Sequence, residues 1–193
     1  MSTPRGGRPR SDRAHRAILE ATRDLLADTG YEALTIEAIA AAAGVGRQTV
    51  YRWWSAKSAV VAEAVLAGLV DAERAAPPDT GDIAADLRTW WRETLAIMAE
   101  PRTAGLVRGL VVAAAENTGD ATLLYARFTG PLRDAITARL HAEAARGRLR
   151  EGAALDTIGE ALIGTLLYRL LTGTAERADT VLVDLLLHGV LRE

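Results

Sequence analysis

Five side chains that can hydrogen-bond to nucleic-acid bases or phosphates lie within one six-residue stretch of this chain of 193 residues. They are Arg47, Gln48, Thr49, Tyr51 and Arg52. Guanidinium and amide groups can form paired hydrogen bonds with base edges in the DNA major groove, and hydroxyls can bind phosphates. Val50 within the stretch and Trp54 after it are apolar and are expected to pack inward. The stretch therefore predicts a DNA-contacting helix; the alternative is a solvated helix in an all-α bundle.

A DNA-contacting helix needs neighbours that hold it at a fixed angle, and the flanking sequence predicts them. Thr35 can cap a short helix that ends near Ala43. Gly44 can adopt a left-handed conformation and so permit a sharp turn before the polar stretch. The predicted helices of this region are residues 12–29, 35–43, 47–54 and 56–75. Two short helices around a glycine-bearing turn are typical of a helix-turn-helix, whose second helix enters the major groove.

Basic residues are concentrated at the N-terminus. Residues 1–60 carry a net charge of +3, whereas residues 61–193 carry a net charge of −5. Within the first sixteen residues, five arginines accompany a single acidic residue, Asp12. A short basic arm of this kind suits a polyanion, although a merely solvated, disordered tail would have the same composition. We expect residues 1–10 to form a flexible basic arm.

Residues 7–69 closely resemble the DNA-binding domain of the TetR family of bacterial transcriptional regulators. The resemblance rests on the run RAHRAILEATRDLLADTGYEALTIEAIAAAAGVGRQTVYRWWSAKSAVVAEAV, which is residues 13–65. The matching features are the break at residues 30–31, the cap at residues 35–36, the turn at residues 42–45 and the ending at residues 51–57. The resemblance implies a sequence-specific transcriptional regulator.

The resemblance also implies roles for individual side chains. Phosphates would be bound by the backbone around Thr35, the Tyr51 hydroxyl and the Lys57 ammonium, and bases would face Arg47, Gln48, Thr49 and Arg52. The family often has a histidine where this chain has Trp53, whose indole N–H can also donate to a phosphate. Arg8 or Arg10 in the basic arm would reach a minor groove and read its width. Double-stranded DNA is the expected partner.

The rest of the chain predicts helices only. Pro77 and Pro78 begin a loop that separates the DNA-contacting region from the C-terminal helices. Further helices are predicted at residues 83–99, 103–116, 120–146, 155–171 and 175–191, with a break or kink near Pro131. The expected fold is therefore all-α with about nine helices. The expected division is residues 1–10 as the arm, 11–57 as a three-helix DNA-binding domain and 58–193 as a helical effector-binding and dimerisation domain.

The last two predicted helices are apolar over more than half of their circumference. One neighbouring helix cannot bury so wide a surface, so a second copy of the chain is expected to cover the excess, unless the monomer has an unusually apolar core. The resemblance implies the same homodimer, because these helices usually pair in the family. The predicted dimer interface is Leu162, Leu166, Leu170, Leu182, Leu185 and Leu186. A twofold dimer should bind an inverted-repeat operator.

The resemblance further implies a small-molecule effector bound among the middle helices. Bulky apolar side chains that could line its pocket are Trp90, Trp91, Met98, Leu106, Tyr125, Phe128 and Tyr168. Side chains of these types at helical spacing are also common in an ordinary core. By the resemblance, the effector would change the angle between the two DNA-binding heads and so oppose DNA binding.

Other classes of protein are disfavoured by the sequence. The chain has no cysteine, its three histidines are scattered, and its serines lie in no nucleophile-elbow motif. We therefore expect no enzyme, no cofactor and no metal site. The longest run without a charge, Ala38–Gly46, is too short to span a membrane, and the arginine-rich start lacks the apolar part of a secretory signal. A cytoplasmic repressor is the expected function; activation, or nonspecific architectural DNA binding without an effector, is the alternative.

Overall fold

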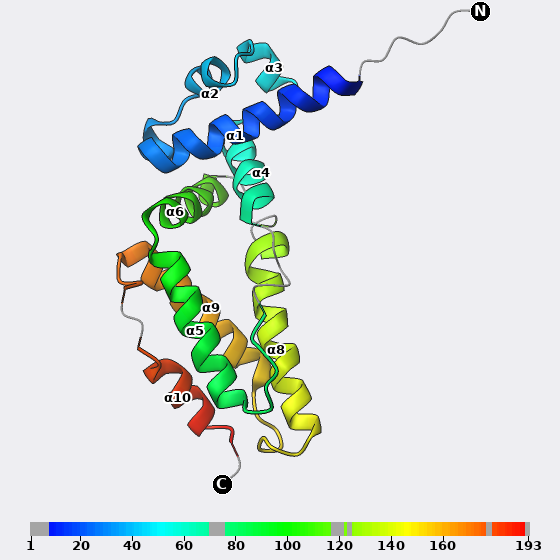
Figure 1. The fold of residues 1–193 in the computed structure, drawn as a ribbon, viewed down its shortest axis with the longest axis vertical. Coiled ribbons are helices and arrows are strands. Elements are labelled where there is room, and N and C mark those ends of the chain that lie inside the picture. Colours follow the sequence, from blue (N-terminus) through cyan, green and yellow to red (C-terminus); the bar gives the residue numbers. More distant parts are fainter. Residues whose placement is uncertain (1–7, 70–75, 117–121, 123–124, 177–178, 192–193) are drawn as a thin grey trace, which may run out of the picture. The chain divides into compact units, whose positions relative to one another are not determined.

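The computed structural model of the chain describes every residue except 1–7, 70–75, 117–121, 123–124, 177–178 and 192–193. Within the described part the chain forms nine α-helices and one π-helical turn, and its sole β-type pairing is the isolated bridge between Leu149 and Leu191 (Figure 1). The predicted all-α fold is confirmed. Contacts divide the chain into a first unit, Met1–Leu69 with Gly105–Leu124, and a second unit, Val70–Ala104 with Tyr125–Glu193.

The first unit begins with four helices. They are α1 (Arg8–Ala33), α2 (Ile36–Ala42), α3 (Arg47–Tyr51) and α4 (Lys57–Leu69). Helix α1 starts inside the segment 1–10 that was expected to be a flexible arm, and residues 1–7 lie outside the described part. At Gly30 the backbone of α1 leaves the helical conformation, with φ 77° and ψ 171°. The predicted end of the first helix at Gly30 is thus confirmed, and one further turn follows it because glycine tolerates positive φ.

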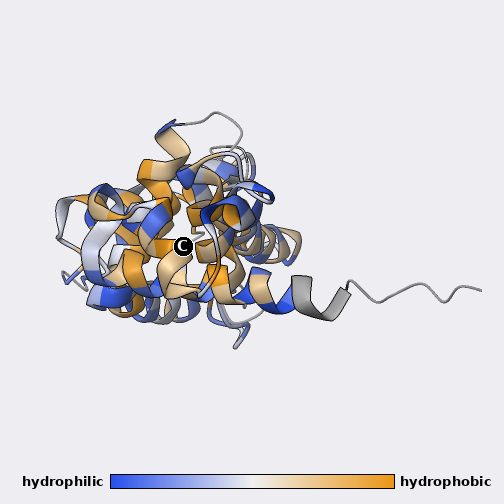
Figure 2. Cartoon of the chain, turned by 90° about the horizontal axis from the view of Figure 1, so that it is seen from above, coloured by the Kyte–Doolittle hydropathy of each residue, from blue (hydrophilic) through white to orange (hydrophobic). Residues whose placement is uncertain are grey.

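Apolar side chains from all four helices form the core of the first unit. Ile18 and Leu26 of α1, Ile39 of α2, Val50 of α3 and Val61 of α4 are fully buried. Six of the thirteen residues of α4 have buried apolar side chains, which is why this helix can pack along α1. Buried apolar area is the main stabilising contribution in such a bundle. Figure 2 shows apolar and polar residues alternating along the helix ribbons, as amphipathic helices require.

Helix α6 (Pro101–Glu116) joins the first unit from its fifth residue onward. Its glycines allow this close approach to α1. A Cβ atom placed on Gly109 would lie 2.7 Å from Cδ1 of Leu26, and one placed on Gly105 would lie 3.6 Å from the backbone oxygen of Ala27. A segment more than seventy residues away in the sequence is therefore part of the same packed unit as α1.

The second unit contains the remaining elements. They are α5 (Ile83–Ala99), the π-helical turn η1 (Tyr125–Thr129), α8 (Gly130–Ala145), α9 (Leu155–Thr172) and α10 (Val181–His188). The predicted break near Pro131 is confirmed, because α8 begins at Gly130 with the proline in its first turn. The last helix is shorter than the predicted residues 175–191. Asp179 lies outside it, since its carbonyl accepts a 3.0 Å hydrogen bond from Nε1 of Trp91 and its carboxylate pairs with Arg169.

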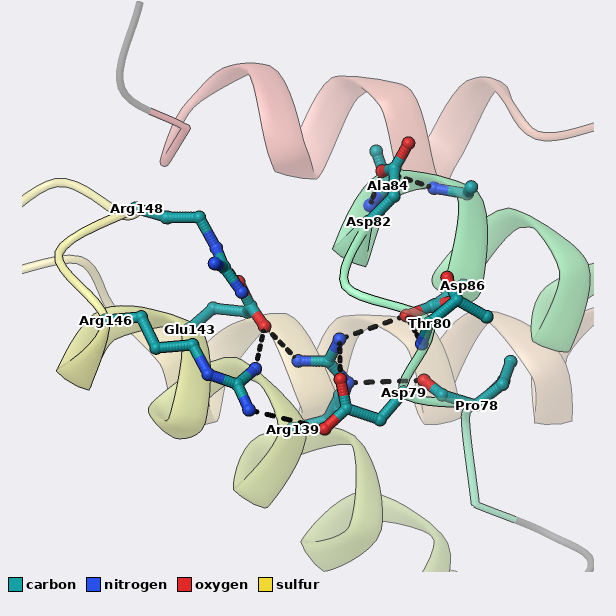
Figure 3. Close-up of polar contacts among 11 residues, drawn as sticks. Pro78, Asp79, Thr80, Asp82, Ala84, Asp86, Arg139, Glu143, Arg146 and Arg148 are labelled. Carbon is teal, nitrogen blue, oxygen red and sulfur yellow. Dashed lines mark hydrogen bonds and ion pairs between the residues drawn. The ribbon is translucent and has the colours of Figure 1, made fainter.

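A set of charged residues with a buried centre, here called the ionic cluster, ties α8 and the residues just after it to the start of α5 and the loop before it (Figure 3). Its members are Asp79, Asp86, Arg139, Glu143, Arg146 and Arg148. The Arg139 guanidinium lies 2.7 Å from Asp79 and 3.0 Å from Asp86, and it also pairs with Glu143. Because Arg139, Asp86 and Glu143 are buried, the pairs that Arg139 makes with Asp86 and Glu143 are screened little by water, whereas Asp79 is exposed.

The surroundings of Glu143 keep it ionised. Hydrogen bonds from Arg148, Arg139 and Arg146 outweigh the effect of burial and lower the pKa of Glu143 from 4.5 to about 2. For Asp86, burial raises the pKa, but hydrogen bonds from Thr80 and Arg139 outweigh it and the net shift is downward. The ionic cluster therefore consists of charged groups whose partners replace their lost hydration.

Candidate nucleic-acid interface

Helix α3 presents polar side chains outward and anchors itself through apolar ones. Arg47, Gln48, Tyr51 and Arg52 are exposed, and Thr49 is half-buried. Val50 is fully buried and Trp54, just after the helix, is nearly so. The predicted inward packing of Val50 and Trp54 is confirmed. A short helix anchored from beneath leaves its outer side chains accessible to a DNA groove.

Helix α2 and the turn after it set the start of α3. The side chain of Thr35 caps α2 by accepting a 3.1 Å hydrogen bond from the backbone N–H of Ala38. The turn then passes through Gly44, which has φ 66°, and Gly46 is the N-cap of α3. Helices α2 and α3 pack against each other, and α2 packs on α1. This is the helix-turn-helix arrangement that the sequence predicts.

Arg47 is paired across the turn with Glu37 of α2. Its guanidinium nitrogen lies 2.7 Å from Oε1 of Glu37, and both side chains are exposed. The hydrogen bond lowers the pKa of Glu37 and raises the pKa of Arg47 from their ordinary values. The sequence analysis did not predict this pair. The opposite charges of Glu37 and Arg47 on either side of the turn were the signal that could have indicated it. The pair places the Arg47 guanidinium beside α2 at the start of α3.

An aromatic cluster lies beneath the other end of α3. The His15 ring stacks on Trp54 with centroids 4.8 Å apart and meets Trp53 edge-on at 5.2 Å. Nε1 of Trp54 donates a 2.7 Å hydrogen bond to Glu63, whose other oxygen lies 3.1 Å from Nε2 of His15. The Arg52 guanidinium lies over the Trp53 ring, 4.9 Å from its centroid. The cluster joins α1, α3 and α4 and supports Arg52 from below.

Lys57 begins α4 and is half-buried beside the break in α1. Its Nζ donates a 2.9 Å hydrogen bond to the backbone oxygen of Tyr31 and lies 4.1 Å from the centroid of the Tyr31 ring. Arg8 and Arg10 lie in the first turn of α1. Contacts of Trp53 and Lys57 with phosphates, and of Arg8 or Arg10 with a minor groove, stay predictions.

Most of the predicted effector-pocket residues lie in the second unit. Trp90, Trp91, Met98 and Phe128 are buried there. Leu106 belongs instead to the first unit, where it is half-buried. The Tyr125 side chain lies outside the described residues. Tyr168 is 65% exposed in the single chain, on the opposite side of α9 from its buried residues, so it is apart from the buried aromatic residues of the predicted pocket.

Only half of the predicted dimer-interface residues lie at or near the surface of the single chain. Leu162, Leu166 and Leu170 of α9 are at most 3% exposed in the single chain, and their place in a dimer interface stays a prediction. They already pack in the chain's own core. On α10, Leu185 is 69% exposed and Leu182 and Leu186 are half-buried. Apolar side chains exposed on these two helices are Tyr168, Leu171, Val181 and Leu185.

Comparison with known proteins agrees with the helix-turn-helix geometry. The family described as bacterial regulatory proteins, tetR family, matches residues 18–64, and the tetracyclin repressor-like C-terminal domain matches residues 77–189. The chain belongs to the TetR family. It is 33% identical to the HTH-type transcriptional regulator YdeS of Bacillus subtilis, in an alignment that covers 95% of this chain and 91% of YdeS. It is 30% identical to the HTH-type transcriptional regulator Rv1556 of Mycobacterium tuberculosis, in an alignment that covers 86% of this chain and 82% of Rv1556.

Solved TetR-family structures share the fold. A transcriptional regulator from Mesorhizobium loti superimposes with a TM-score of 0.71 at 19% identity and covers 95% of this chain and 99% of its own. SmeT of Stenotrophomonas maltophilia, solved as a complex with triclosan, has a TM-score of 0.68 at 22% identity over 93% of this chain and 92% of its own. In the part of the TetR-family chain described here, no helix is long and apolar enough to cross a membrane.

Proposed function

We propose that this TetR-family regulator is a homodimeric repressor that binds an inverted-repeat operator and is released from it by a small-molecule effector. It would act in the cytoplasm, where its DNA target lies. The observation that carries the proposal is the outward polar side of α3, where Arg47, Gln48, Tyr51 and Arg52 are exposed above a buried Val50. SmeT, a neighbour in fold, is named as the repressor of a multidrug efflux pump and has been solved with triclosan.

The proposed base contacts come from Arg47, Gln48, Thr49 and Arg52. Arg47 and Arg52 lie at the two ends of α3. Arg47 pairs with Glu37, and the Arg52 guanidinium lies over the Trp53 ring. A side chain that is already oriented loses less conformational entropy when it binds a base. Tyr51, Trp53, Lys57 and the backbone around Thr35 are the proposed phosphate contacts, which set the position of α3.

The proposed dimer surface is built from the exposed apolar side chains of α9 and α10. Its proposed members are Tyr168, Leu171, Val181, Leu182, Leu185 and Leu186. Four of them are more than half exposed in the single chain, and a group of exposed apolar side chains on two helices that contact each other is typical of a surface that a partner covers. A twofold dimer would place two α3 helices in successive major grooves, roughly 34–36 Å apart.

The proposed effector site lies in the second unit, among Trp90, Met98 and Phe128. What supports this site is that the three bulky apolar side chains lie in one unit, since such side chains line most pockets for small apolar ligands. An effector that binds better to a conformation unsuited to the operator would lower DNA affinity, and by linkage DNA would lower effector affinity equally.

Selection of random duplexes on the full-length protein at near-physiological salt, followed by sequencing, tests the proposal directly. An enriched inverted repeat would support a specific dimeric regulator and supply the DNA for an effector screen. Weak binding without enrichment that disappears as the salt concentration rises would contradict it and favour nonspecific binding to phosphates.

Substitutions in α3 should separate base contacts from phosphate contacts. Arg47→Ala or Arg52→Ala should weaken binding to the selected operator by about 1–3 kcal/mol and relax the selected sequence, because a base-specific hydrogen-bond pair is lost. Lys57→Ala should weaken binding to every sequence alike. Titrations on operator and on mixed-sequence duplex measure both effects, and Arg127→Ala, an exposed arginine of the second unit, is the matched control. Equal losses on both duplexes would reject the base contacts.

A charge in the proposed dimer surface should separate the protomers. Leu185→Glu should raise the dimer dissociation constant about tenfold or more, since a carboxylate would be desolvated at a buried apolar contact. The fold of each protomer should survive because Leu185 is exposed. Sedimentation equilibrium measures the constant. Ile97→Glu, at another exposed apolar position, on α5, is the control and should leave the dimer unchanged.

A further inference from the structure

A continuous chain of contacts links the end of α6 to the first residue of α4. The Tyr31 hydroxyl donates a 2.5 Å hydrogen bond to Oε2 of Glu116, the last residue of α6. The Tyr31 backbone oxygen and ring both contact the Lys57 ammonium. All three residues belong to the first unit. These contacts therefore connect Lys57, a proposed phosphate contact, to Glu116, which is 85 residues from Tyr31 in the sequence.

Tyr31 restricts the Lys57 side chain in two ways. Its carbonyl accepts one ammonium hydrogen, and its ring face attracts the positive charge from 4.1 Å. An ammonium has three donors, so these contacts leave it able to bind a phosphate as well. A flexible lysine held in this way has lost much of its conformational freedom before DNA arrives, which favours binding.

Glu116 restricts Tyr31 in turn. The ring is buried directly after the break at Gly30, and its hydroxyl is fixed by the Glu116 carboxylate. A hydrogen bond from a phenol to a carboxylate also moves electron density toward the ring, which strengthens the attraction of its face for a cation. Glu116 thus affects both the position of the Tyr31 ring and the strength of its attraction for the Lys57 ammonium.

The packing of α6 against α1 places Glu116 within the first unit, next to Tyr31. Gly109 and Gly105 let α6 lie directly against Leu26 and Ala27 of α1 (Figure 1). Glu116 is the last residue of the same helix, and it lies within the residues that match the C-terminal domain of the family. A residue of that C-terminal region is therefore fixed to the segment that holds Lys57.

We infer that Glu116 is a positioning residue for DNA binding, which orients Tyr31 and through it holds the Lys57 ammonium ready for a phosphate. The inference rests on the proposed phosphate contact of Lys57. It predicts an effect with an unusual sign. Removing a carboxylate from a protein ordinarily raises its affinity for DNA, because less negative charge opposes the phosphates. Here neutralising Glu116 lowers the affinity.

Fluorescence anisotropy of the full-length protein on a labelled mixed-sequence duplex tests this at low and moderate salt. Glu116→Gln and Tyr31→Phe should each weaken binding about threefold, the factor that corresponds to a loosened cation–ring contact. The matched control is Glu32→Gln, which removes the same charge from an exposed residue next to Tyr31 and should leave affinity equal or higher. Melting curves monitor folding, and exposed Glu116 should tolerate glutamine.

A double-mutant cycle decides whether the effect passes through Lys57. In a Lys57→Ala background, Glu116→Gln should cause no further loss. A loss that persists in that background, or an affinity of Glu116→Gln equal to or above that of the unmodified protein, overturns the inference and leaves the proposed function intact. An unchanged affinity for Lys57→Ala alone rejects the proposed phosphate contact of Lys57 and the inference with it.

Discussion

Replacing Glu143 by glutamine is expected to lower the free energy of unfolding by about 3 kcal/mol, which is a large part of the stability of an ordinary domain. Glutamine keeps the size of the side chain but removes the charge that pairs with Arg139, Arg146 and Arg148. Arg139 would then stay buried with fewer partners. Denaturant unfolding, followed by tryptophan fluorescence to which Trp90 and Trp91 of the same unit contribute, measures the loss.

The same contribution should depend on pH. The pKa of Glu143 is about 2 in the folded protein and 4.5 without these contacts, so the unfolded state takes up the proton first as the pH falls. The stabilisation is therefore fully present above the unfolded pKa and is lost as the pH falls from 4.5 toward about 2. Consequently, the difference between the unmodified protein and Glu143→Gln should shrink across this range.

An exposed glutamate provides the control for both measurements. Glu160→Gln, on α9, makes the same chemical change at the surface and should alter the free energy of unfolding by no more than about 0.5 kcal/mol. Equal small losses for the two variants would mean that the ionic cluster contributes nothing net, as happens when desolvation cancels attraction. A difference between unmodified and Glu143→Gln protein that stays constant with falling pH would contradict the lowered pKa.

The local features of the DNA-binding unit could be predicted because short-range rules determine them. Gly30 ends the regular part of α1, Thr35 caps α2, and Val50 packs inward, each as expected from the residue type and its neighbours. Gly44 at φ 66° allows the turn, since other residues rarely adopt that conformation. These signals lie within a few residues of the structure that they specify.

The contacts between distant residues could not be predicted from one sequence. Glu116 and Tyr31, or Arg139 and Asp86, are brought together by helix packing, and nothing in their immediate neighbours indicates the pairing. The exposed and buried sides of α9 could not be predicted for a related reason. Helix α9 is apolar on most of its sides, so periodicity could not tell that Leu162 is buried in the chain's own core while Leu171 is exposed.

The second large effect is expected at Trp54, which anchors α3 without being a proposed DNA contact. Trp54→Ala should lower the stability of the first unit by about 3–5 kcal/mol, because a buried ring is replaced by a cavity. The stacking on His15 and the hydrogen bond to Glu63 are lost as well. With α3 unanchored, DNA binding should fall for every sequence, although none of the proposed contact residues has changed.

Trp54→Phe separates the two contributions of this side chain. Phenylalanine keeps most of the buried ring and the stacking surface but cannot donate to Glu63, so the expected loss is only about 1 kcal/mol. Trp53→Ala is the matched control: Trp53 is half-buried and supports Arg52, so this variant should mainly weaken operator binding and destabilise the unit less. Thermal melts with parallel DNA titrations distinguish these outcomes. If Trp54→Ala lost DNA affinity without losing stability, Trp54 would be a direct contact and the anchoring role would be wrong.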